Sequence, residues 1–188
     1  MHTPLETMTE TIGFDEQTRS LYSFDAFKDR ENGTILRHLY NYWVTLPVGA
    51  HGLPHEDQCR PKVDLSAKVA DMVSWIDTTP DDPLNFIIRD HVESTIPGWG
   101  VELSDKPLCN CPEMEMHTTA CAVEYLFCKH ERKPMYHEID QLIGGLKRHY
   151  TRIMLPVENN AGEVDRIYYA TNQLQPITRV AFHVVGES

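Results

Sequence analysis

Apolar residues recur at intervals of three and four in two segments of the chain, a spacing typical of helices with one buried face. The first segment follows Thr34, a suitable N-cap, and ends before Pro47, which predicts a helix over residues 35–46. The second segment begins at Met116 and stops at Pro134. The predicted stripes are Ile35, Leu39, Tyr42, Trp43 and Leu46 in the first helix, and Met116, Ala120, Val123 and Phe127 in the second.

The last third of the chain has the alternating, β-branched pattern of strands. Strand-length runs cover residues 135–143, 146–157 and 164–174, and Gly144-Gly145 predicts a tight hairpin between the first two. The segment ENNAG predicts a longer turn before the third run. Alternation in that run places Ile167 and Tyr169 on one face, and Tyr168 and Ala170 on the other.

Two shorter strands are predicted upstream, at residues 74–78 and 85–89, joined by the turn TTPDDP. A short helix over residues 65–72, capped by Asp64, precedes them, and small helices and loops are expected over residues 94–115. The order is therefore a helix, two strands, a helical crossover and a three-strand meander. This order indicates an α+β fold, an antiparallel sheet with helices on one face.

Composition describes one ordinary globular protein of 188 residues, 41% hydrophobic and 24% charged. A formal net charge of -11 argues against binding of nucleic acid, and no apolar run has the roughly 18 residues of a membrane span. The N-terminus lacks the basic and apolar parts of a secretory signal. Together with an odd number of cysteines, this predicts reduced thiols and a cytoplasmic protein.

Three stretches resemble the short PAS-like proteins of alphaproteobacteria. Tyr42-Trp43 with residues 61–64 resembles that group's opening, and HYTRIMLPVENNAGEVDRIYYA resembles its final hairpin. In the block NFIIRDHVESTIPGWGVELSDKPL, the residues that match in type and spacing are Phe86, Arg89, Trp99, Gly100, Glu102, Leu103, Ser104 and Leu108. Val92 stands where the family usually has a glycine, so a different local turn is expected there.

The resemblance covers roughly residues 35–176 and implies a PAS-like fold: a five-stranded antiparallel sheet with a helical crossover on one face and an N-terminal helix. The regions expected are a loosely held N-terminal arm (1–31), a PAS-like domain (32–176) and a C-terminal tail (177–188). The resemblance also implies a stand-alone sensory or regulatory protein in signalling, which binds a small ligand, a protein partner or both. The apolar surface of helix 35–46 further predicts a homodimer.

A curved sheet under a helical flap encloses a pocket, which is where small ligands bind. The candidate lining residues are the inward-pointing apolar and aromatic ones, with one arginine. They are Phe86, Ile88, Trp99, Met116, Tyr125, Phe127, Tyr150, Arg152, Met154 and Tyr168. Tyr125, Tyr150 and Arg152 are expected to orient a ligand, because a buried hydroxyl or guanidinium requires a partner. The sequence identifies no cofactor.

Thiols and imidazoles gather in CNCPEMEMH and CAVEYLFCKH, and both groups are zinc ligands. The set is Cys109, Cys111, His117, Cys121, Cys128 and His130. Its first pair has C-x-C rather than C-x-x-C spacing, which favours buried or idle thiols over a metal. His117 is interpreted as a solvent-exposed residue at a helix start rather than a haem ligand. Pro112-Glu113-Met114 follows Asn110-Cys111, so flavin photochemistry is not expected.

Two other functions stay open. A small-pocket isomerase or dehydratase would use an Asp–His pair as general base, but Asp90 and His91 are neighbours on a strand and point to opposite faces. No nucleophile-elbow, P-loop, dinucleotide or H-E-x-x-H motif occurs, and no catalytic residue is predicted. The third function is a pure interaction scaffold with a closed core, which docks a partner through Leu36, Leu39 and Trp43.

Overall fold

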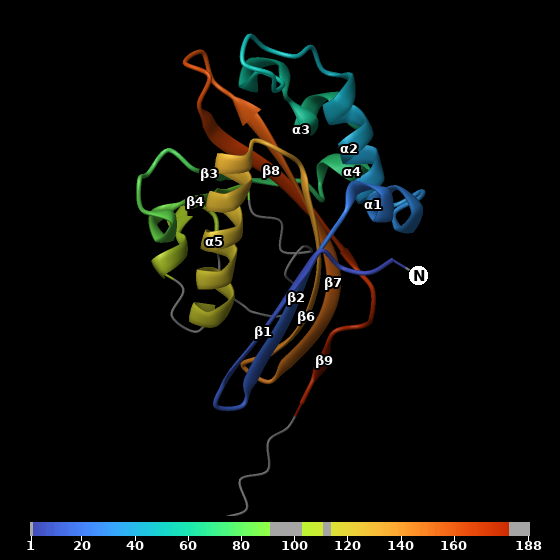
Figure 1. The fold of residues 1–188 in the computed structure, drawn as a ribbon, viewed down its shortest axis with the longest axis vertical. Coiled ribbons are helices and arrows are strands. Elements are labelled where there is room, and N and C mark those ends of the chain that lie inside the picture. Colours follow the sequence, from blue (N-terminus) through green and yellow to red (C-terminus); the bar gives the residue numbers. More distant parts are fainter. Residues whose placement is uncertain (1, 91–102, 111–113, 181–188) are drawn as a thin grey trace, which may run out of the picture.

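The computed structural model describes residues 2–90, 103–110 and 114–180. Its centre is an antiparallel sheet with helices packed on both faces (Figure 1). In the described residues nine strands pair in the order β1-β2-β6-β7-β8-β3-β4-β5, and β9 pairs with β7. Their bounds are β1 Glu6–Ile12, β2 Asp15–Tyr22, β3 Ser74–Asp77, β4 Ile87–Arg89, β5 Lys106–Pro107, β6 Met135–Ile143, β7 Leu146–Glu158, β8 Val164–Gln173 and β9 Thr178–Arg179.

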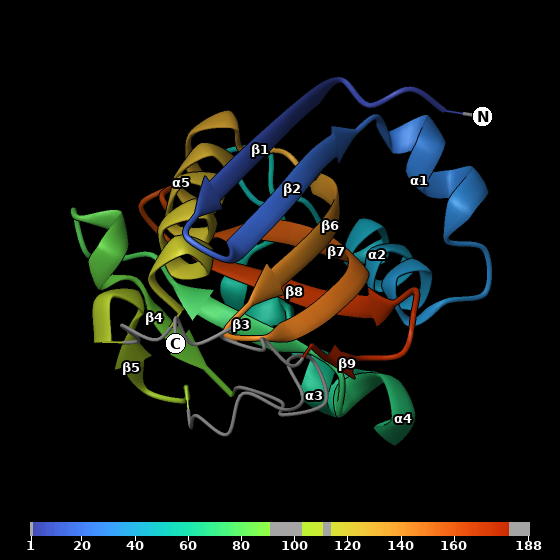
Figure 2. The ribbon, with the colours of Figure 1, turned by 90° about the horizontal axis from the view of Figure 1, so that it is seen from below.

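Five α-helices lie within the described ranges. They are α1 Phe24–Arg30, α2 Ile35–Thr45, α3 Pro61–Asp64, α4 Ala67–Ala70 and α5 Glu115–Glu131. Helix α5 lies on one face of the sheet, and α1 and α2 lie on the other, as the view from below shows (Figure 2). The α+β class and the antiparallel sheet are confirmed, whereas five strands and helices on a single face are corrected. No described helix has the length and apolarity that crossing a bilayer requires.

Strands β6, β7 and β8 form where the alternating pattern predicted them. Gly144 and Gly145 take positive φ angles of 56° and 75°, which a residue without Cβ adopts readily, and so close the β6–β7 hairpin. Alternation divides β8 as expected: Ile167 and Tyr169 pack in the core under α5. Tyr168 packs in the core on the α2 side.

The N-terminal region is not the loosely held arm that its polar composition suggested. Strands β1 and β2 form a hairpin, and β2 pairs with β6 from Glu16 to Tyr22. Hydroxyl pairs of Thr7 with Ser20 and of Thr9 with Thr18, each 3.1 Å apart, join the two strands. Alternating threonines are good strand formers, but it is the distant partner β6 that supplies the other half of the pairing.

Two helices differ from the prediction. Of the helix expected over residues 65–72, only the short α4 forms; the extended Leu65 (φ -97°, ψ 160°) ends α3, which lies before the predicted range. In α5 two residues of the apolar stripe predicted to be buried are instead exposed, Val123 at 60% and Phe127 at 48%. Small and polarisable side chains form the buried face of α5 instead, and these carry no strong apolar period. Those residues are Met116, His117, Thr118, Ala120, Cys121, Ala122, Tyr125 and Cys128.

Candidate functional site

Five charged or polarisable side chains meet between α5 and the sheet. His117, Cys121 and Glu124 follow one another at spacings of four and three, which places them on one side of α5. Arg19 comes from β2 and Arg152 from the middle of β7. We call this set the Cys121 cluster. It joins three segments that are far apart in the sequence.

Glu124 is the carboxylate of the Cys121 cluster. Arg19 donates to it through Nε at 2.8 Å and Nη2 at 2.6 Å, a two-pronged pair, and Arg152 Nη2 donates to the same carboxylate. The Arg19 and Arg152 side chains are only 1% and 3% exposed, and that of Glu124 is 12% exposed. Burial alone would raise the pKa of Glu124, but the two guanidinium charges hold it well below its usual value.

The thiol of Cys121 lies among three nitrogen groups. Arg152 Nη1 is 3.2 Å from Sγ, Arg19 Nη2 is 3.3 Å away and His117 Nε2 is 3.4 Å away. Burial opposes ionisation, yet His117, Arg19 and Arg152 lower the pKa of Cys121 to about 5. The surrounding charges therefore favour the thiolate form of this buried sulfur, which together with Glu124 balances the two arginine charges.

Other polar groups orient the members of the Cys121 cluster. The Nδ1 atom of His117 is 3.0 Å from Gln141 Oε1, and Arg19 Nη1 donates to Gln17 Oε1 at 3.1 Å. His137 lies 3.7 Å from Glu124 Oε1. Burial and the nearby arginines together lower the pKa of His137 to about 4, against the opposing effect of Glu124. His137 is therefore neutral at pH 7.

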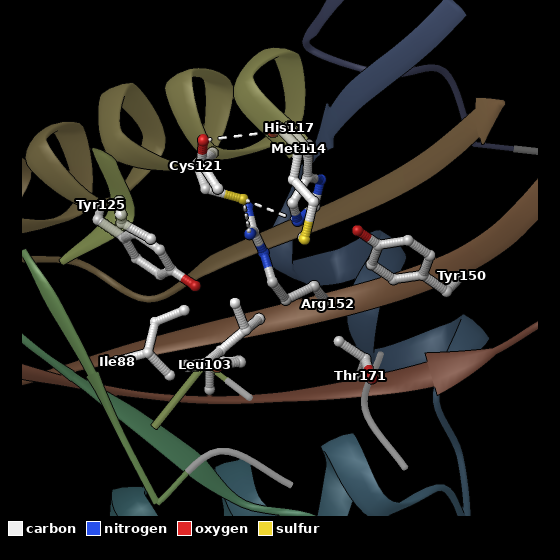
Figure 3. Close-up of a pocket in the computed structure, with 12 residues that line it drawn as sticks. Ile88, Leu103, Met114, His117, Cys121, Tyr125, Tyr150, Arg152 and Thr171 are labelled. Atoms are coloured by element: carbon white, nitrogen blue, oxygen red, sulfur yellow. Dashed lines mark hydrogen bonds between the residues drawn. The ribbon is translucent and has the colours of Figure 1, made fainter. Parts of the chain in front are cut away.

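A cavity of about 20 Å³ adjoins the Cys121 cluster (Figure 3). This volume has room for one water-sized molecule. Within the described residues, the Nε atom of Arg152 is buried without a hydrogen-bond partner. Apolar and polar side chains share the wall: Ile88, Leu103, Leu108, Met114, His117, Thr118, Cys121, Tyr125, Tyr150, Arg152, Tyr169 and Thr171. In Figure 3 the rings of Tyr125 and Tyr150 lie on either side of Arg152.

A groove of about 270 Å³ reaches the same cluster from the outer side, between the β1–β2 hairpin and α5. Glu6, Arg19, Glu124 and His137 contribute its polar part. Its apolar part is Met8, Leu21, Val123 and Phe127. The partly exposed carboxylate of Glu124 is thus reached from the groove, while Cys121 and Arg152 border the inner cavity.

The structure brings together four of the ten residues predicted for the pocket: Ile88, Tyr125, Tyr150 and Arg152 line the cavity. Phe86 and Met154 are buried in the same core without lining the cavity, and Met116 is buried nearby. Two residues lie elsewhere, because each faces away from the cavity. Phe127 points to the groove, and Tyr168 lies on the α2 face, where its hydroxyl donates to the Cys59 carbonyl at 2.7 Å. Trp99 lies outside the described residues.

His117 is not the exposed helix-start residue that the sequence suggested, since only 5% of it is exposed. Among the described residues no three His, Cys, Asp or Glu side chains are placed to hold a metal ion. Cys111 lies outside those residues, as does His91 of the Asp90-His91 pair. Sequence reasoning missed Arg19 and Glu124. The one local signal was the spacing of His117, Cys121 and Glu124 within a buried helix.

Comparison with known proteins finds no matching family, no similar curated protein and no similar solved structure. Functional inference therefore depends on the chemistry of the Cys121 cluster. That chemistry is a buried thiol held by two guanidinium groups, contacted by three structural segments and lying beside a cavity with room for one water-sized molecule.

Proposed function

We propose that this chain is a cytoplasmic, PAS-like sensory or regulatory protein that detects a small molecule where α5 packs on the sheet. Of the six strands described in the region of resemblance, the five longest are β3, β4, β6, β7 and β8. They are neighbours in the order β4-β3-β8-β7-β6, and α5 lies between β4 and β6 in the chain. A five-stranded set with a helical crossover packed on one face supports the PAS-like proposal. The β1–β2 hairpin and the short β5 and β9 are additions to it.

The observation that carries the proposal is the way the Cys121 cluster links separate segments. Arg19 holds the hairpin to α5, and Arg152 holds β7 to the same helix, both through Glu124 and the Cys121 thiolate. A molecule that alters the charge of one member therefore alters the attachment of all three segments. A sensory domain requires such a shared contact. A ligand shifts the equilibrium between two conformations only if its contacts differ between them.

The dimensions of the cavity favour a sensor of a very small molecule over an enzyme at this place. A space of about 20 Å³ leaves no room for an ordinary metabolite, which argues against a small-pocket enzyme acting there. A mostly apolar ligand would also fit poorly beside Arg152 and Cys121. A very small polar molecule suits this space better. The closed-core scaffold stays the second candidate, because most of the α5 face is tightly packed core.

Hydrogen exchange on two cysteine variants tests the linkage. Cys121→Ser removes the thiolate, and Cys128→Ser is its matched control on the same buried face of α5. We expect Cys121→Ser to accelerate exchange in β2, α5 and β7 together, and Cys128→Ser to affect only the end of α5. If both variants change α5 alone, the segments are not coupled, and the scaffold is the better proposal. Native mass spectrometry of freshly purified full chain tests separately for a bound ligand.

Self-association through helix α2 stays a prediction. Leu36 and Leu39 are fully buried against the sheet, and Trp43 Nε1 donates to the Pro156 carbonyl at 2.9 Å, so much of the apolar surface that suggested a dimer is covered within one chain. Light scattering of the full chain at high micromolar concentration tests it. A monomer there contradicts the homodimer.

A further inference from the structure

The described cysteines occupy three different environments. Cys109 is exposed, Cys59 and Cys128 are buried, and Cys121 is buried among charges. Burial raises the pKa of Cys59 to about 12, and it raises the pKa of Cys128 as well. Only the Cys121 sulfur, of these four, has guanidinium donors on it and a cavity beside it.

We propose that Cys121 is an oxidation site, whose thiolate reacts with hydrogen peroxide in the adjoining cavity to form a sulfenate. The proposal goes beyond sensing, because the reaction requires only the site and not a signalling output. Three observations carry it: the donors around Sγ, the space beside it, and a buried donor of Arg152 that lacks a partner within the described residues. A water-sized polar guest in the cavity would accept from that Nε atom.

The step balances without a further reactant. The Cys121 sulfur attacks one peroxide oxygen, an S–O bond forms and the O–O bond breaks. The proton of the attacked hydroxyl passes to the departing oxygen, which leaves as water, and the product is a sulfenate anion. Sulfur loses two electrons and the peroxide gains them. The negative charge stays in the cluster, so Arg19 and Arg152 remain neutralised.

A fast reaction of Cys121 with hydrogen peroxide depends on the guanidinium groups. A lower pKa provides more thiolate at pH 7, but it also weakens the thiolate as a nucleophile, and the two effects largely offset one another. Arg152 and Arg19 can instead stabilise the charge that develops on the departing oxygen, because their donors are already fixed beside the sulfur. The small cavity adds selectivity: hydrogen peroxide enters, and bulky hydroperoxides and thiol reagents are excluded.

The experiment exposes the folded full chain to hydrogen peroxide and then unfolds it in the presence of dimedone, which traps sulfenic acid. Cys109, Cys111, Cys121 and Cys128 share one tryptic peptide, so fragment spectra must assign the label, with a Cys109→Ser/Cys111→Ser double variant as a check. We expect Cys121 to be labelled about tenfold faster than Cys109 or more. Cys59 and Cys128 should stay unlabelled.

Three further arms control the result. A bulky maleimide should label Cys109 and spare Cys121 in the folded chain, and cumene hydroperoxide should oxidise Cys121 far more slowly than hydrogen peroxide does. Arg152→Lys keeps the positive charge but removes the planar guanidinium with its paired donors. It should slow oxidation of Cys121 without making Cys121 accessible to maleimide. The wild-type comparison decides the matter even if that variant misfolds. Oxidation of Cys121 no faster than of Cys109, or only after urea is added, would overturn the proposal.

Discussion

The two faces of the sheet handle buried polar groups in opposite ways, although consecutive residues supply them. On the α2 face, Tyr136 packs with Phe27 at a ring separation of 5.2 Å, and the buried Glu31 accepts from neutral groups, Tyr136 at 2.7 Å and Thr151 at 2.6 Å. On the α5 face, Arg152 pairs with the Glu124 carboxylate, and the neutral His137, its cross-strand neighbour, lies 3.7 Å from the same carboxylate.

This contrast indicates that the two faces differ in how far their stability depends on pH. Aromatic packing and hydrogen bonds from uncharged donors involve no pairing of charges, so the stability that the α2 face contributes is expected to depend less on pH. The α5 face contains groups with displaced pKa values, a carboxylate, a thiolate and a neutral imidazole, and its stability depends on protonation. The chemistry of this protein is therefore expected on the α5 face.

The largest expected effect comes from breaking the charge pairing. Glu124→Gln leaves Arg19 and Arg152 buried without their shared carboxylate, which should lower the free energy of unfolding by about 3–5 kcal/mol. Urea unfolding followed by circular dichroism measures this. The matched control is Glu131→Gln on the same helix, whose exposed ion pair with Lys133 contributes at most about 1 kcal/mol. Equal effects of the two variants would show that the α5 face tolerates unpaired charge.

The next effect is a dependence of stability on pH. His137 binds a proton in the unfolded chain below pH 6.5, but in the folded chain only below about 4. Between these values the unfolded state holds more protons, so stability should fall as the pH falls, by about 3 kcal/mol at most. Glu124 and Cys121 act in the same direction, since folding lowers the pKa of both. Thermal unfolding at several pH values should show a shallower slope for His137→Asn, and an unchanged slope would count against this assignment.

A smaller effect is expected on the opposite face. Tyr136→Phe removes the hydroxyl that donates to the buried Glu31 carboxylate, which should cost about 1–3 kcal/mol. A double-mutant cycle with Glu31→Gln isolates the interaction between the two side chains. The cost of Tyr136→Phe should be the same at pH 5 and pH 8, in contrast with the pH-dependent α5 face. A cost that varies with pH would remove the distinction between the faces.

The smallest effect concerns the outer side of α5. Phe127→Ser changes a half-exposed residue and should alter the free energy of unfolding by about 0.5 kcal/mol or less. Tyr125→Ala, two residues earlier and buried beside the cavity, should cost about 3–5 kcal/mol. Urea titration of both variants compares them. A large loss of unfolding free energy with Phe127→Ser would show that Phe127 belongs to the buried face of α5, as the sequence predicted.

The sequence by itself determined those helices and strands that depend on a pattern of a few neighbouring residues. The Thr34 cap and the apolar period determine α2, and alternation with two glycines determines the β6–β7 hairpin. Ile88, Tyr125, Tyr150 and Arg152 could be chosen for the cavity because alternation and burial of polar groups are local signals. The PAS resemblance and the sensory role derived from it stay predictions.

Only the tertiary structure decided what joins distant segments. Arg19 and Glu124 are 105 positions apart, and no local pattern marks a polar hairpin as half of a buried ion pair. The facing of α5 was decided in the same way: its apolar period is weak, and Val123 and Phe127 would have filled a core as well as Cys121 and Tyr125 do. Paired charge favours the side chosen, because Glu124 and Cys121 face Arg19 and Arg152 only when the helix is turned to bury the thiol.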